Sequence, residues 1–125
     1  MTSDEINVLG NIFNTTFGRS STNISPTIAL NTKMQGDQAI ITYTSIIMLV
    51  DHHSNRQLIA NEVSAAQQVI DRYIASTKKK FKKHCKRTLT MKCEDTTHTV
   101  VPVVYRPNGV PSDTVFKLTA ICELR

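Results

Sequence analysis

Two adjacent histidines follow an acid at Asp51-His52-His53, and this group could bind a metal ion or exchange a proton near neutral pH. A tetrahedral metal site needs further ligands, and none follows in the sequence at a familiar spacing. We therefore interpret the tripeptide as a polar connector between two elements. An enzyme built on a His52/His53 metal site is the third of three functional hypotheses.

A second group with the chemistry of zinc ligands consists of His84, Cys85, Cys93 and His98, but Cys85-x7-Cys93-x4-His98 is not a zinc-finger spacing. Cys85, Cys93 and Cys122 fall on the apolar sides of their predicted elements, and free cysteine is among the most buried residue types. We expect structural cysteines, with no metal and no other cofactor. Because three cysteines leave at least one unpaired, they fit a reducing compartment better than secretion.

Residues for nucleophilic catalysis or phosphate binding form no recognisable pattern in this sequence. It contains no G-x-S-x-G turn and no pair of carboxylates in an apolar setting. The four glycines stand apart at positions 10, 18, 36 and 109, so the sequence has no glycine-rich phosphate loop. We predict a protein that is not an enzyme and has no catalytic residue.

A dense block of positive charge covers residues 78–87, which hold seven Lys or Arg residues and no acid. Fifteen basic residues less these seven leave eight against ten acidic residues, so the rest of the chain is slightly negative. A helical block of this kind could neutralise several phosphates and bind nucleic acid in a salt-dependent way. The residues considered for such a basic patch are Lys78, Lys79, Lys82, Lys83, Lys86 and Arg87.

The basic block has two other interpretations, and no nucleic-acid-binding motif accompanies it. It could be a solvated helix end whose charge suits the negative end of the helix dipole. It could also pair with an acidic neighbour in an assembly. All three interpretations stay open at the level of sequence.

Two helices are predicted from apolar residues that recur every three or four positions. The first covers residues 3–17, with Ser3 or Asp4 as its N-cap and Gly18 as its stop. The second is long and covers residues 54–87, where Ser54 and Gln57 form a capping-box pattern.

Five strands are predicted from alternating or β-branched runs at 27–34, 39–50, 89–93, 100–105 and 113–124, while 19–25 is read as a polar connector. Pro102 cannot donate a ladder hydrogen bond and indicates an edge or a bulge. The fold class is therefore α+β: a largely antiparallel five-stranded sheet, in the order α-β-β-α-β-β-β. We expect the long helix to pack across one face of the sheet.

The second face of the predicted sheet is neither cleanly polar nor cleanly apolar, although a solvated antiparallel face normally alternates sharply. Either the helix at 3–17 covers it or another protein chain does, and the sequence does not separate the two. The residues assigned to this face are Ile40, Thr42, Thr44, Ile46, Met48, Thr90, Lys92, Val100, Val104, Val115 and Ile121.

The chain has 125 residues, of which 40% are apolar and 20% charged, and this size suits one domain over residues 1–125. Within it, the helix at 3–17 is the detachable part and residues 27–125 form the α+β core. No apolar run reaches the ~18–20 residues that span a bilayer, and the N-terminus is acidic where a signal peptide is basic. We expect no membrane association and a location in the cytoplasm or in a particle assembled inside the cell.

The first functional hypothesis is a non-enzymatic structural subunit of a larger protein assembly, with a viral (phage) particle or tail component as the first example. Its partners would be other subunits, identical or different, held by apolar and charged contacts. The alternative is a small nucleic-acid-binding protein that uses Lys78–Arg87. The interface residues predicted for the first hypothesis, on the helix at 3–17 and the loop at 106–112, are Ile6, Leu9, Phe13, Phe17, Arg106 and Asn108.

Overall fold

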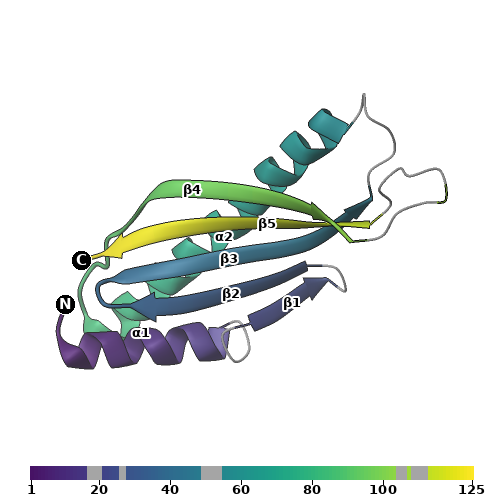
Figure 1. Cartoon of the computed structure of the whole chain (residues 1–125). Helices are drawn as coiled ribbons and strands as arrows, with labels where there is room; N and C mark the ends of the chain where they lie inside the picture. The colour runs from purple at the N-terminus through teal and green to yellow at the C-terminus, as the bar shows by residue number, and fades with distance from the viewer. Residues whose placement is uncertain (17–20, 26–27, 49–54, 104–106, 108–112) are drawn as a thin grey trace.

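A computed structural model describes residues 1–16, 21–25, 28–48, 55–103, 107 and 113–125. It confirms the α+β class, with a long helix, a short N-terminal helix and a five-stranded antiparallel sheet (Figure 1). Three strands precede the long helix and two follow it. The elements are α1 (Ser3–Thr16), β1 (Ser21–Ser25), β2 (Ile28–Gln35), β3 (Gln38–Met48), α2 (Asn55–Cys85), β4 (Met91–Pro102) and β5 (Asp113–Leu124).

The strands lie in the order β1-β2-β3-β5-β4, and every neighbouring pair is antiparallel. A tight turn joins β2 to β3, and Gly36 adopts a left-handed conformation there (φ 61°). The chain enters the sheet at one edge, β1, and β4 forms the other. The edge position predicted from Pro102 is therefore correct, with this proline as the last residue of β4.

The strand boundaries differ from the prediction at two places. The segment predicted as a polar connector contains β1, whose Ser-Thr-Asn-Ile-Ser sequence has no apolar alternation that would predict a strand. The two strands predicted at 89–93 and 100–105 are instead one strand, β4. Its register shifts between Cys93 and Asp95, and such a bulge interrupts the period of two that a continuous strand would show.

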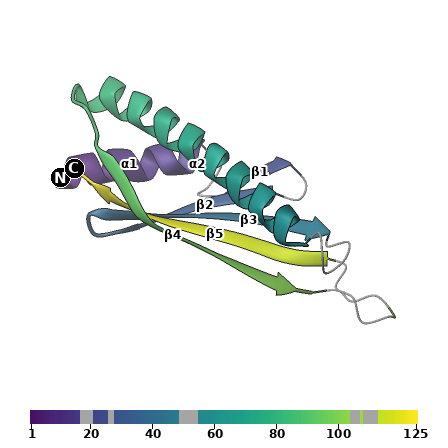
Figure 2. The same ribbon diagram turned by 90° about the horizontal axis from the view of Figure 1, so that it is seen from above.

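Both helices pack on the same face of the sheet, as Figure 2 shows. The long helix α2 buries Ala66, Ile70, Tyr73, Thr77 and Phe81 against alternate residues of the strands. The short helix α1 lies beside α2 on that face, where the ring centroid of Phe13 is 5.9 Å from that of Tyr73. The second face of the sheet is therefore not covered by the N-terminal helix. The core residues of α1 are Leu9, Ile12 and Phe13.

The start of α1 is fixed by a capping box with Thr2 as the N-cap, one or two residues before the predicted N-cap at Ser3 or Asp4. The backbone N–H of Glu5 donates to Thr2 Oγ1 (3.1 Å), and the backbone N–H of Thr2 donates to Glu5 Oε1 (3.0 Å). The other oxygen of Glu5 accepts a hydrogen bond from Arg87, just beyond α2, whose guanidinium lies 5.0 Å from the centre of the Phe81 ring. Glu5 thus joins the start of α1 to the end of α2.

We expect the Glu5→Gln variant to melt at a lower temperature than the wild type near neutral pH. The bond from Arg87 and that from Thr2 lower the pKa of Glu5 from 4.5 to about 2. Because the folded protein therefore binds this proton less readily, the stabilisation is complete above pH 4.5 and is lost as the pH falls to about 2. The melting temperatures of the two proteins, measured across this pH range, should converge at the acid end. Asp4→Asn, on the exposed side of the same turn, is the control, and parallel curves for Glu5→Gln would contradict this role.

Candidate protein-interaction surface

Neither described helix covers the sheet face opposite α1 and α2, which we call the open face, and the strand register shows which side chains share it. Residues directly opposite each other on neighbouring strands point to the same side of a sheet. The middle of the face carries threonines, because Thr42 of β3 pairs with Thr119 of β5, which pairs with Thr97 of β4. Among the described residues, no helix covers this row.

One end of the open face is apolar. Ile46 of β3 and Val101 of β4 lie on either side of Val115 of β5. In the next row, Met48 pairs with Asp113, whose carbonyl oxygen accepts a hydrogen bond from the N–H of Val103 (2.9 Å). Their exposed fractions are 50% for Ile46, 61% for Met48, and 54% each for Val101 and Val103. We call Ile46, Met48, Val101, Val103 and Val115 the apolar patch.

Part of the predicted second face is confirmed and part is corrected by the bulge in β4. Ile40, Ile46, Met48, Val115 and Ile121 belong to the open face, as alternation indicated. Val100 was assigned to it as well, but it pairs with the buried Phe116 and packs against the core. Because the bulge adds one residue to β4, Val101 takes the open side instead. The sequence analysis missed Val101 and Val103 for this reason, and Val104 lies outside the described residues.

The predicted interface on α1 is corrected by the structure. Leu9 and Phe13 are exposed by 0% and 2%, so they belong to the chain's own core and cannot meet a partner while α1 stays in place. Ile6 is half-buried. The other three predicted interface residues, Phe17, Arg106 and Asn108, lie outside the described residues. The apolar stripe of α1 was read correctly, but it faces α2 and the sheet.

The basic block divides into an exposed ridge and an inner group. The ridge consists of Lys79, Lys82, Lys83 and Lys86, which are exposed and recur at the three- and four-residue spacing of one helix side. Lys78 and Lys80 are half-buried, and Arg87 is bound to Glu5. The side of α2 that carries the ridge lies opposite its buried residues, so the ridge points away from the sheet. The helix ends at Cys85, and the next residue, Lys86, has a left-handed conformation (φ 57°).

The cysteines and histidines of the described chain do not gather into a metal site. Cys93 and Cys122 form a disulfide between β4 and β5, and Cys85 at the end of α2 is free. His98 of β4 stacks on Phe116 (6.0 Å between centroids), whereas His84 faces α1. The described residues contain no cluster of three or more His, Cys, Asp or Glu side chains placed to hold a metal ion. Asp51, His52 and His53 lie outside them.

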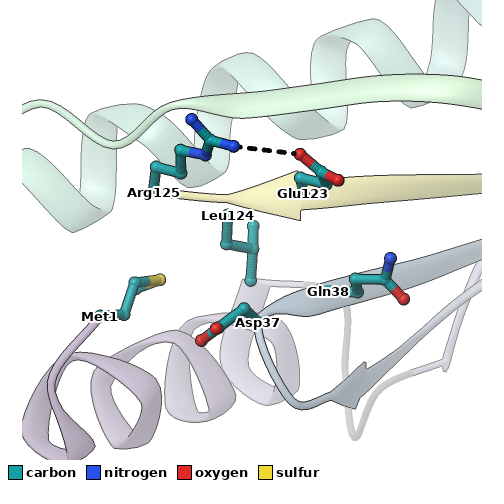
Figure 3. A pocket seen from close by; sticks show the side chains of 6 residues that line it. All are labelled: Met1, Asp37, Gln38, Glu123, Leu124 and Arg125. Atoms are coloured by element: carbon teal, nitrogen blue, oxygen red, sulfur yellow. Dashed lines mark ion pairs between the residues drawn. The ribbon is translucent and has the colours of Figure 1, made fainter.

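A hollow of about 500 Å³ lies at the other end of the sheet from the apolar patch, where the N-terminus, the β2–β3 turn and the end of β5 meet (Figure 3). Its side chains carry mixed charge, and Arg125 and Glu123 form an ion pair of 3.6 Å along its rim. None of the lining residues is a nucleophile paired with a base. The lining residues are Met1, Asp37, Gln38, Glu123, Leu124 and Arg125.

Comparison of the chain with family models, curated proteins and solved structures finds no match. Neither helix in the described part of the chain combines the length and the apolar character needed to cross a membrane. The functional assignment therefore depends on the surfaces themselves.

Proposed function

We propose that this protein is a non-enzymatic structural subunit of a larger protein assembly and that it contacts its neighbours through the open face of the sheet. The observation that carries the proposal is the position of the apolar patch. Ile46, Met48, Val101 and Val103 are the large hydrophobic residues exposed in the described part of the chain, and all four gather at one end of this face. A virion or tail particle is one assembly of this kind.

The position of the helices supports this proposal. Both lie on the other face, and α1 already buries its apolar stripe there, so neither described helix is left to cover the patch. Contiguous apolar patches on a soluble protein mark interaction sites more often than isolated exposed residues do. An apolar centre with polar surroundings is also the usual composition of a protein interface, and the patch borders threonines and Lys117.

Site-specific crosslinking tests this proposal. A photoactivatable residue at Met48, in the cells that produce the protein, is expected to give a discrete adduct of higher mass. The same residue at Asn31, which is exposed on β2 in the middle row of the open face and outside the apolar patch, should not give this adduct. Adding Ile46→Lys should abolish the Met48 adduct without lowering the thermal midpoint, because Ile46 is half exposed. Equal adducts from Met48 and Asn31, or none from Met48, would contradict the proposal.

Nucleic-acid binding through the basic block is a second candidate function, favoured by the exposure of the four ridge lysines. Four lysines are fewer than the seven basic residues of the sequence block, because the others are half-buried or bound to Glu5. Their affinity for nucleic acid should fall steeply with added salt. Binding at low salt that Lys79→Glu and Lys83→Glu together remove would favour this candidate over the first.

A further inference from the structure

The two edges of the sheet differ in length and regularity. At one edge, β1 has five residues and an irregular pairing between Asn23 and Ser25. At the other edge, β4 has twelve residues. An edge strand presents a row of backbone N–H and C=O groups to any further strand, and proteins commonly limit this by keeping edge strands short. The edge at β4 is not limited in this way.

The side chains of β4 are also exposed on both faces of the sheet. Of those whose burial the structure describes, only that of Met91 is buried. Thr97, Thr99 and Val101 are exposed on the open face, and His98 is exposed on the helix face. Figure 2 shows the C-terminal half of β4 running clear of α2. Among the described elements, α2 approaches β4 no further along the strand than Thr96, so a strand that pairs with the edge beyond Thr96 would meet neither helix.

The usual protective devices are missing from the centre of β4. Its register shift lies before this region, between Cys93 and Asp95, and Pro102 lies after it. Between them, Thr-Thr-His-Thr-Val-Val at 96–101 contains no lysine, proline or glycine, and five of its six residues are β-branched. Such a sequence favours strand pairing. The disulfide between Cys93 and Cys122 holds β4 against β5, so the edge is fixed in place before any partner arrives.

We propose that β4 of one copy pairs with β4 of a second copy over Thr96–Val100, antiparallel and about a two-fold axis at His98. This inference rests on the proposed function and names the second copy as a partner. An unpaired strand edge binds another strand, and the sequence of β4 allows it to pair with β4 of a second copy. A two-fold pairing centred on His98 sets Thr97 opposite Thr99 and Thr96 opposite Val100, so each pair is uncharged and shares one face of the sheet. The charged residues of β4, Lys92, Glu94 and Asp95, lie outside the paired stretch.

Pairing of this kind joins the two five-stranded sheets into one continuous sheet. With the axis perpendicular to the sheet, the helices of both copies lie on one side and both apolar patches lie on the other. The ridge lysines point away from the sheet on the helix side, so they do not oppose the contact. The dimer then presents two apolar patches on a single face to the other subunits of an assembly.

Lysine substitutions at exposed positions of β4 test the inference. Thr97→Lys with Thr99→Lys places like charges across the two-fold axis, and we expect at least a tenfold rise in the dimer dissociation constant by sedimentation equilibrium. Both side chains are exposed, so the thermal midpoint should hold. The matched control is Asn31→Lys with Gln35→Lys, on exposed positions of β2, and it should dimerise like the wild type.

Charge reversal makes the test specific for contact between two β4 strands. A Thr97→Glu/Thr99→Glu variant should also fail to dimerise alone, but it should form a mixed dimer with the lysine variant. A wild type that stays monomeric would overturn the inference, as would a lysine variant that dimerises normally. If the Met48 adduct forms in either case, the assembly proposal survives and only the pairing of β4 is wrong. If β4 pairing is confirmed and no Met48 adduct forms, the role of the apolar patch is wrong.

Discussion

Replacing Phe13 by alanine is expected to reduce the free energy of unfolding by about 3–5 kcal/mol, the usual cost of removing a buried phenylalanine. Phe13 of α1 is 2% exposed and lies against Tyr73 of α2, within the core that the two helices share. The whole free energy of unfolding of such a domain is about 5–15 kcal/mol, so the variant should be close to unfolding. Chemical denaturation followed by circular dichroism measures the difference.

The matched control for Phe13→Ala is Asn7→Ala, which changes an exposed residue of the same helix and should have almost no effect. The comparison separates two roles for α1. A helix that completes its own core loses stability with Phe13, whereas a helix that reaches a partner loses only assembly. A cost below about 1 kcal/mol, together with a change in solution mass, would contradict the packing described above.

Replacing Glu62 by alanine is expected to destabilise the protein by roughly 2–3 kcal/mol, because two buried hydroxyl groups lose their acceptor. Glu62 Oε1 accepts hydrogen bonds from Tyr43 Oη (2.7 Å) and Ser45 Oγ (2.8 Å), and these residues are only 1% and 2% exposed. Burial, and to a smaller extent Glu62 itself, raise the pKa of Tyr43, so its hydroxyl keeps its proton and remains a donor.

Two variants distinguish lost hydrogen bonds from lost packing at Glu62. Glu62→Gln keeps an oxygen acceptor and should cost much less than alanine. Tyr43→Phe removes one donor together with its need for a partner, so its cost should be nearer 1 kcal/mol. Denaturant midpoints of the three variants at one pH give the comparison. Equal losses for Glu62→Gln and Glu62→Ala would show that the hydrogen bonds contribute little.

The class of fold was predictable because the strongest patterns in the sequence are long. The three-and-four spacing of α2 persists over 31 residues, and the alternation of β5 continues through all twelve of its residues. Both patterns reflect one buried side against one exposed side, which local periodicity records directly. The buried residues of these elements, from Ile70 and Phe81 to Phe116 and Leu118, follow these two periods.

The errors arose where one residue or one partner decides the outcome. The bulge in β4 reverses the sides of Val100 and Val101, and nothing in a run of threonines and valines reveals its position. The short β1 has no apolar alternation to detect. The stripe of α1 is equally suited to its own chain or to another, so periodicity predicts the helix without predicting what it packs against.

In the candidate site too, local pattern predicted some features and the packing of the elements decided the others. Ile46 and Met48 were assigned to the correct face, but the patch they form depends on the alignment of β3, β5 and β4. Interface residues were sought on the detachable helix, although the exposed surface lies on the sheet. The basic block was identified at once from composition, whereas its division into a ridge and an inner group required the orientation of α2.

The central claim is that the chain completes its own core on the helix side and binds other protein chains with the surfaces that remain uncovered. The most direct measurement is the solution mass of the wild-type protein by light scattering over a wide range of concentration. The mass should rise from that of one chain, 14.0 kDa, to at least twice this value. A mass of one chain at every concentration, together with no adduct at Met48, would contradict the claim.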